Sequence, residues 1–151
     1  MLPLNTILCP VDFSESSNKA FQNAIEMATH FQATIVLAHV VPSVPPIPAD
    51  PAYVFEGPEY ERLQQAEAEK HLAIVAKAIP PRLKARTIIG SGDAAEEIVR
   101  LATTEVADLI VIATHGLTGW RHLVFGSVAE KVIRMSDRPV LVIPVHKPEE
   151  K

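Results

Sequence analysis

Two glycines and a serine in the last third of the chain have the types and spacing that suit phosphate binding. Nine residues separate Gly116 from Gly126, and Ser127 follows the second glycine at once. The apolar run Leu109–Ile112 predicts a buried strand before them, and the residues from Ser127 predict a helix. A glycine-bounded loop between a strand and a helix N-terminus presents backbone N–H groups to an anion. The same residues also fit an ordinary connection in which Ser127 caps the helix and Glu130 reaches back, so spacing alone leaves both interpretations open.

Polar residues at other predicted strand ends suit the same kind of site. Asp12 follows the apolar run Leu4–Val11, and its carboxylate suits a ribose hydroxyl, a Mg²⁺ ion or a turn ahead of Ser14. His115 suits a hydrogen-bond donor that orients the loop better than it suits a general base. The histidines show no HxxxH or HExxH spacing and Cys9 is the single cysteine, so no dedicated metal site is expected. GxxxxGK[ST] and GxSxG motifs are absent, which gives little support for catalysis.

Alternating apolar runs and helical patterns predict the elements that hold these residues. Strands are expected at Leu4–Val11, Thr34–Val41, Leu83–Ile89, Leu109–Ile112 and Arg138–Val145. Helices are expected after Ser14, from Glu59 to Ile79, after a capping-box-like Asp93 and Glu96, and from Ser127; residues 90–92 predict a tight turn. This alternation predicts an α/β fold with an open five-stranded parallel sheet, helices on both faces and the third strand near an edge. Such sheets bind ligands beyond the carboxyl ends of their strands.

A proline-rich segment, residues 42–58, interrupts the pattern. Prolines at 42, 45, 46, 48, 51 and 58 exclude a helix interior or a central strand there. We expect a surface loop, which is either a spacer or a lid over the ligand site. No repeat or long linker divides the sequence, so residues 1–151 are expected to form a single domain.

Composition and charge narrow the classes of partner and the location. The formal net charge is −4 and aromatic residues make up 5% of the chain, so no binding to nucleic acid or to an anionic membrane is expected. No apolar run approaches the ~18 residues of a membrane span, and the N-terminus lacks a secretory signal pattern. A cytoplasmic location is expected, and Cys9, inside an apolar run, is expected to be a packed thiol and not a reactive one.

Three segments resemble the universal stress protein family: ILCPVDFSESSNKA, IVLAHVV and ATHGLTGWRHLVFGSVAEKVIRMSDRPVLVIPV. The ATP-binding branch of that family carries G-x2-G-x9-G-[ST], and Ala113 stands here in place of the first glycine. The resemblance implies a Rossmann-like fold, similar to adenine nucleotide alpha hydrolases, that binds ATP or AMP together with Mg²⁺. Adenine would lie near Val11 and Val40, and Asp12 would face ribose or hold the metal. The implied binding residues are Pro10, Val11, Asp12, Val40, Ile112, Ala113, Thr114, His115, Gly116, Gly126, Ser127, Val128 and Ala129.

The resemblance also implies a homodimer in which Val140–Val145 pairs antiparallel with its counterpart. The sequence supports an exposed edge there, because VLVIPV is a long apolar strand that would otherwise invite aggregation. The leading hypothesis is a non-enzymatic stress-response or signalling regulator with an unknown protein partner. The alternatives are a dimeric interaction protein that needs no nucleotide, as Ala113 suggests, and a slow ATPase or adenylating enzyme. PVDFSES stands where such enzymes usually carry an SGGxDS-type loop.

Overall fold

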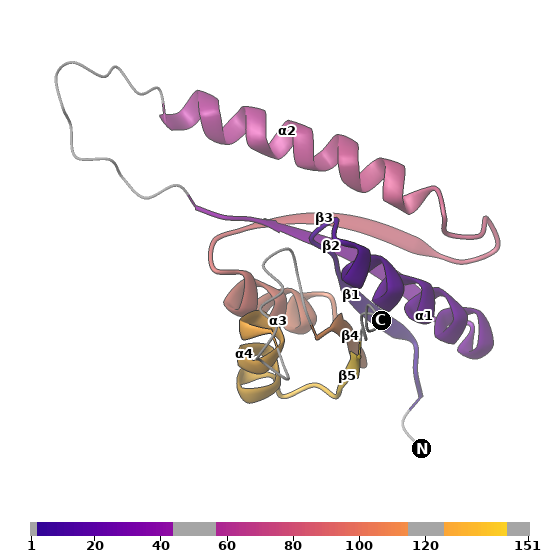
Figure 1. The fold of residues 1–151 in the computed structure, drawn as a ribbon. Coiled ribbons are helices and arrows are strands. Elements are labelled where there is room, and N and C mark those ends of the chain that lie inside the picture. The colour runs from indigo at the N-terminus through magenta and orange to yellow at the C-terminus, as the bar shows by residue number, and fades with distance from the viewer. Residues whose placement is uncertain (1–2, 44–56, 115–125, 145–151) are drawn as a thin grey trace, which may run out of the picture.

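The computed structural model describes residues 3–43, 57–114 and 126–144 (Figure 1). Its strands and helices alternate along the chain: β1 Thr6–Pro10, α1 Glu15–Phe31, β2 Thr34–Val41, α2 Gly57–Ala76, β3 Ala85–Ser91, α3 Ala94–Thr104, β4 Leu109–Ala113, α4 Ser127–Met135 and β5 Val140–Ile143. The five strands form one parallel sheet in the order β3-β2-β1-β4-β5. This confirms the predicted parallel α/β sheet and the place of the third strand at an edge.

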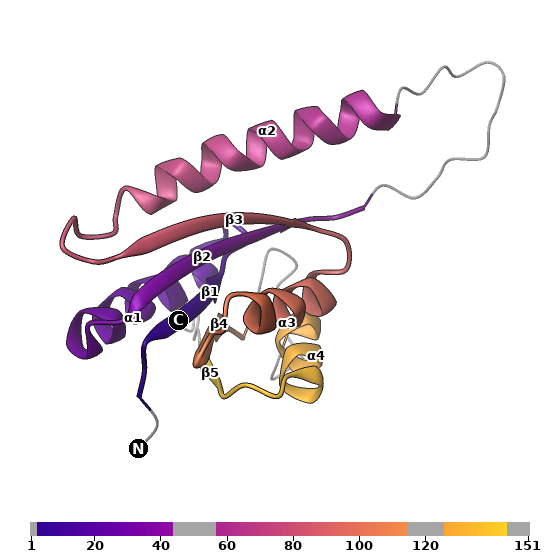
Figure 2. The same ribbon diagram turned by 180° about the vertical axis from the view of Figure 1, so that it is seen from behind.

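Helices cover both faces of the sheet, α1 and α2 on one and α3 and α4 on the other (Figures 1 and 2). Neighbouring strand residues alternate between the two faces, as an extended chain requires. Ile7 and Val111 are fully buried on the α1–α2 side, whereas Leu8 and Ile110 are fully buried on the α3–α4 side. The winding direction reverses between β1 and β4, which is where sheets of this kind bind ligands.

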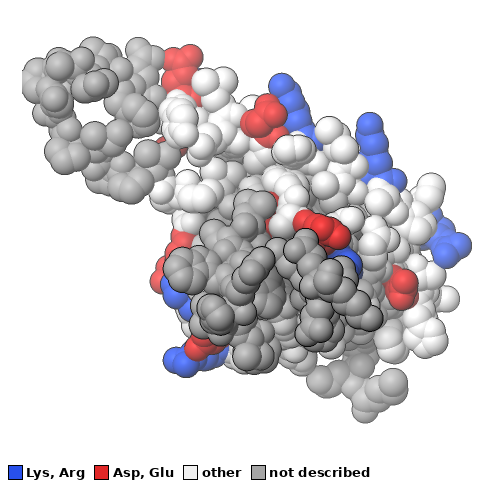
Figure 3. Space-filling view, viewed as in Figure 1, with Lys and Arg blue, Asp and Glu red and all other residues white. Residues whose placement is uncertain are grey.

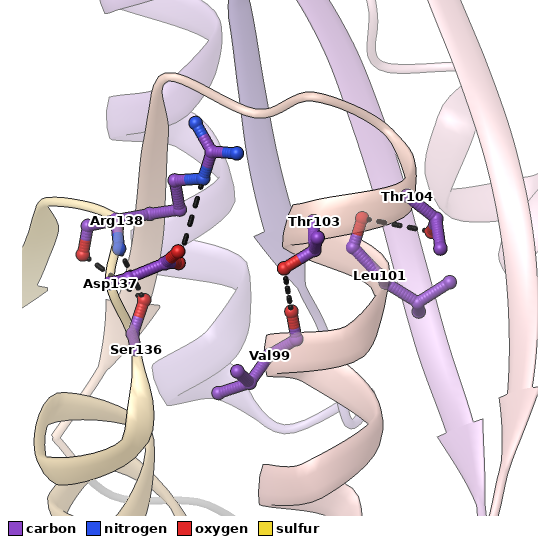
Figure 4. Close-up of polar contacts among 7 residues, drawn as sticks. All are labelled: Val99, Leu101, Thr103, Thr104, Ser136, Asp137 and Arg138. Carbon is purple, nitrogen blue, oxygen red and sulfur yellow. Dashed lines mark hydrogen bonds and ion pairs between the residues drawn. The ribbon is translucent and has the colours of Figure 1, made fainter.

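The first and last strands are both shorter than predicted, and β1 begins at Thr6 and not at Leu4. Pro10 is the last residue of β1, and Val11 N–H still donates to Ala38 O of β2 at 2.8 Å. Instead of spanning residues 138–145, β5 ends at Ile143, and Val145 lies outside the described residues. Arg138 belongs to the turn that precedes β5, because Ser136 Oγ accepts from its N–H at 3.0 Å and donates to its carbonyl at 3.1 Å (Figure 4).

Two predicted loop boundaries are wrong. The helix α2 begins at Gly57, so Gly57 and Pro58 are helical and do not belong to a loop over 42–58. Proline is tolerated there because a first-turn N–H has no helical acceptor. Most of that segment, residues 44–56, lies outside the described residues. The strand β3 runs through Ser91 because its last residues pair with β2, so the turn falls on Gly92 with φ +126°.

The cysteine is part of the packed core. Cys9 is fully buried among the residues that face α1, and burial raises its pKa to about 12. Its thiol is therefore protonated at neutral pH, as expected of a packed side chain. Within the described ranges, none of the helices combines the length and apolarity that a membrane crossing needs.

Candidate functional site

The turn between β1 and α1 holds Asp12 through a network of hydrogen bonds. Asp12 Oδ1 accepts from Ser14 N–H at 3.0 Å and from the Ser14 hydroxyl. Asp12 N–H donates to Oγ of the buried Ser17 at 3.3 Å. Ser14 caps α1, since its Oγ accepts from Ser17 N–H at 3.1 Å. Asp12 thus has the turn role that its sequence position allowed, and its role toward ribose or metal stays a prediction.

Thr114 joins the end of β4 to the start of α4. Its N–H donates to Ile143 O of β5 at 3.1 Å, and its carbonyl accepts from Gly126 N–H. These two hydrogen bonds place Gly126 at the carboxyl edge of the sheet, beside the strand end that precedes it in the sequence. Two of the predicted binding residues, His115 and Gly116, lie outside the described residues.

The predicted capping box at the start of α4 is wrong. Gly126 is the N-cap, with φ −65° and ψ 149°, so Ser127 is already the first helical residue. Glu130 does not reach back to the cap, because its carboxylate pairs with Arg134 at 2.8 Å on the outside of the helix. A glycine at the N-cap position has no side chain with which to close the helix end.

Three backbone donors therefore stand at the start of α4. The first hydrogen bond within the helix runs from Glu130 N–H to Gly126 O at 3.0 Å. The N–H groups of Ser127, Val128 and Ala129 precede it and have no acceptor in their own helix. They carry the positive end of the helix dipole, which favours an anion.

The α3 N-terminus differs in this respect, because Asp93 closes it. Asp93 Oδ1 accepts from the N–H groups of Ala95 and Glu96, both at 3.1 Å. The hydrogen bond from Glu96 N–H, aided by Lys131 of α4 at 3.3 Å, holds the Asp93 pKa below its usual value. In α1 and α3 the side chain of the N-cap residue, Ser14 or Asp93, accepts hydrogen bonds from N–H groups of the first turn. In α4 no side chain does so among the described residues.

The methyl group of Ala113 points away from α4. Ala113 is 8% exposed and packs in the cluster that faces α1. Ala129, at the start of α4, belongs to the cluster on the opposite face of the sheet. The methyl that distinguishes Ala113 from a motif glycine thus lies in the core and not between β4 and the helix donors.

The other residues predicted to contact a nucleotide lie near the carboxyl ends of their strands, at the boundary of the core. Val11 and Ile112 are 5% and 6% exposed, on opposite faces of the sheet, and Pro10 at the end of β1 is also buried. Val40 is half-buried on the α3–α4 side, so more of its side chain is accessible at this edge. Among the described residues, no group of three or more His, Cys, Asp or Glu side chains is arranged to hold a metal ion.

Two histidines that the sequence did not single out, His39 and His71, pack around the β1–α1 turn. His39 Nδ1 lies 2.7 Å from Val11 O, and its ring centroid lies 4.3 Å from that of Phe13. Phe13 also contacts the His71 ring, at 4.7 Å. A polar residue near the end of an otherwise apolar strand was the available signal for His39.

Charges on the face shown in Figure 3 are mixed. In the part of that face that the structure describes, acidic and basic side chains are interspersed and do not gather in one patch. The described part of that face therefore shows no broad patch of positive charge that would attract an anion.

Comparison with known proteins agrees with this class of α/β fold. The profile of the universal stress protein family matches residues 3–144. The universal stress protein MJ0531 of Methanocaldococcus jannaschii is 35% identical over 146 residues, which are 95% of this chain and 84% of that protein. The solved structure of MJ0577 from the same organism has a TM-score of 0.79 at 27% identity and covers 97% of this chain and 100% of its own. The chain belongs to the universal stress protein family.

Two more distant universal stress protein structures contain nucleotides. One is a complex with cAMP, with 22% identity and a TM-score of 0.61, over 95% of this chain and 98% of that one. The other, from Archaeoglobus fulgidus, is a complex with dAMP, with 18% identity and a TM-score of 0.62, over 94% and 98%. At these identities the likeness establishes the shared fold.

Proposed function

We propose that this chain binds an adenine nucleotide, ATP or AMP, at the carboxyl edge of its sheet. In this proposal it acts as a non-enzymatic regulator in a stress response or signalling pathway. The observation that carries the proposal is the start of α4, where Gly126 is fixed beside Thr114 and leaves the helix without a side-chain cap. Helix donors at a strand end are a common seat for phosphate.

The rest of the proposed site follows from the neighbouring strand ends. The phosphates would be held by the N–H groups of Ser127, Val128 and Ala129 together with the loop that begins after Thr114. The base would lie toward the half-buried Val40, and the ribose toward Asp12. The buried methyl of Ala113 supports nucleotide binding by this chain despite the missing motif glycine.

A Mg²⁺ ion would be held by phosphate oxygens together with Asp12. One carboxylate plus phosphate oxygens is an ordinary donor set for Mg²⁺, which keeps several waters and does not require a cage of protein ligands. Asp12 Oδ1 already accepts from Ser14, so the residue has a fixed position before any ion arrives. The ion would neutralise phosphate charge beside this carboxylate.

The edge strand β5 supports the proposal of a homodimer. It lies at one end of the sheet, and all four of its residues are half-buried. On the adjacent α4, the apolar side chains of Ile133 and Met135 are 44% and 47% exposed. Antiparallel pairing of Val140–Val145 with a second copy would cover this edge. Analytical ultracentrifugation at micromolar concentration should give twice the monomer mass, and a monomer would refute the pairing.

The test of the nucleotide site is Gly126→Asp, with Gly126→Asn as its matched control. The backbone at φ −65° accepts any L residue, and Asp and Asn are both good N-caps, so stability should be kept or raised by a few tenths of a kcal/mol. The Asp carboxylate would occupy the phosphate seat with a like charge. Calorimetry should therefore show loss of ATP-Mg and AMP binding in Gly126→Asp, and a smaller loss in Gly126→Asn.

The alternative function, a dimeric interaction protein that needs no nucleotide, predicts a different result. Mass spectrometry of the heat-released fraction of purified protein would then contain no adenine nucleotide, and ATP-Mg would not shift the melting temperature. Unchanged ATP titration in Gly126→Asp would place any nucleotide elsewhere. Steady-state phosphate release well above ~0.1 per second would instead revive an enzymatic role, since enzymes typically turn over at ~1–1000 per second.

A further inference from the structure

The residue that precedes the helix cap of α1 has an unusual backbone conformation. Phe13 has φ +64°, in the left-handed region that bulky residues rarely adopt. Such a conformation is unfavourable for a bulky side chain and persists only when its surroundings hold it. Its neighbour Asp12 is the single acidic residue of the proposed nucleotide site, so whatever holds Phe13 also sets the position of that carboxylate.

His39 of β2 contacts this turn at two points. Its Nδ1 lies 2.7 Å from Val11 O, so Nδ1 carries a proton and donates to that carbonyl. Its ring lies against the Phe13 ring, with centroids 4.3 Å apart and planes 32° from parallel. His39 therefore contacts the residue before Asp12 and the residue after it. His71 of α2 adds a second ring contact to Phe13, at 4.7 Å and 33°, but no hydrogen bond that the structure describes.

We infer that His39 is a positioning residue for the nucleotide site, holding Asp12 in place through the Val11 carbonyl and the Phe13 ring. The inference rests on the proposed function, since it assigns Asp12 a ligand to face. The hydrogen bond contributes most to this positioning. Val11 lies beyond the end of β1, and the hydrogen bond from the His39 side chain links its carbonyl to β2. The ring contact holds the left-handed turn that follows.

The hydrogen bond and the ring contact can be separated by substitution. In His39→Asn the amide nitrogen stands the same number of bonds from Cβ as Nδ1, so a donor to Val11 O is kept and the ring is lost. In His39→Phe a ring of similar shape is kept and the donor is lost. The variant His71→Ala removes only the second ring contact from an exposed position, and serves as the control.

The first measurement is affinity for ATP-Mg and AMP by calorimetry, well below the melting temperature of each variant. Losing one part-buried hydrogen bond corresponds to about a five- to tenfold weakening of nucleotide binding. We expect that loss in His39→Phe, recovery to within about threefold of the wild type in His39→Asn, and less than about twofold change in His71→Ala. A purely structural role would lower melting temperatures without this rescue by His39→Asn.

The second measurement needs no nucleotide. Hydrogen exchange of Asp12 N–H, which donates to Ser17 Oγ, should quicken by at least about tenfold in His39→Phe but not in His39→Asn. The amide of Ile110, which donates to Pro139 O in another part of the sheet, reports global stability. If the wild type binds no nucleotide but the exchange pattern holds, the proposed function fails and His39 still positions Asp12. If Asp12 exchange and nucleotide affinity are both unchanged in His39→Phe, the inference is overturned.

Discussion

Replacing Ala113 by glycine would complete the glycine motif that the resemblance to the family implies. The structure predicts that this substitution lowers stability without improving affinity for a nucleotide. The Ala113 methyl is 8% exposed and packs on the α1 side of the sheet. Removing a buried methyl costs about 0.8 kcal/mol. Glycine in a strand interior costs roughly a further 0.5–1 kcal/mol through chain entropy. The sum is about 1.5 kcal/mol, which for a chain of this length lowers the melting temperature by about 3–6 °C.

Affinity should be almost unaffected by the same substitution. The methyl lies on the face opposite Ala129 and the other α4 donors, so glycine opens no space beside the proposed phosphates. Calorimetry with ATP-Mg at 15–20 °C should give a dissociation constant within about twofold of the wild type. Ala38→Gly is the control, because Ala38 is a fully buried strand alanine and should show a similar loss of stability. A tightening of tenfold or more in Ala113→Gly would show that the methyl obstructs the nucleotide.

Two further predictions concern the β3–α3 connection. A methyl group in Gly90→Ala would lie 2.5 Å from Glu97 Cγ and 2.8 Å from its Oε1, so urea denaturation should show a loss of about 1–3 kcal/mol; an unchanged value would mean that Glu97 moves aside freely. The pKa of Glu97 is lowered mainly by its hydrogen bond to Arg100, and that of Asp93 by the N–H of Glu96, from ordinary values of 4.5 and 3.8. A carboxyl with a lower pKa in the folded state stabilises it above the unfolded-state pKa, and this contribution is lost as the pH falls through the folded-state value. The urea concentration at the unfolding midpoint should therefore decrease as the pH is lowered below about 4.5. This decrease should be shallower in Asp93→Asn and in Glu97→Gln. Equal slopes of midpoint against pH in the wild type and both variants would contradict the assignment.

The order of elements could be predicted from the sequence because each follows from a local pattern. Apolar runs such as Thr34–Val41 are buried strands, and the i, i+4 spacing from Ala20 to Ala28 makes one buried face of α1. The ends of elements were predicted less well, because pairing between strands decides them. The strand β3 continues to Ser91 since it pairs with Val41, a residue fifty positions earlier in the sequence.

The start of α4 could not be predicted for a related reason. Glycine and serine are both acceptable N-caps, so the pair Gly126 and Ser127 leaves the cap ambiguous. The hydrogen bond from Gly126 N–H to Thr114 O decides it, and no local pattern shows that bond. The role of His39 was missed likewise. Its polarity in an apolar strand marked the residue but not its partner, because Val11 lies twenty-eight residues away in the sequence.

The two halves of the proposed site are built in opposite ways, and this difference explains how one small edge of the sheet could bind a nucleotide. The β1–α1 half is preset, because Asp12 is held by Ser14, Ser17 and the contacts of His39 before any ligand arrives. The α4 half has no capping side chain on its donors, because its cap is a glycine. A preset carboxylate limits the ordering needed when ribose or Mg²⁺ binds, which favours affinity. N–H groups without a side-chain cap would give the phosphates partners that need not first be released from a side chain. Closing α4 with a capping side chain, or loosening Asp12, would each remove one of these advantages.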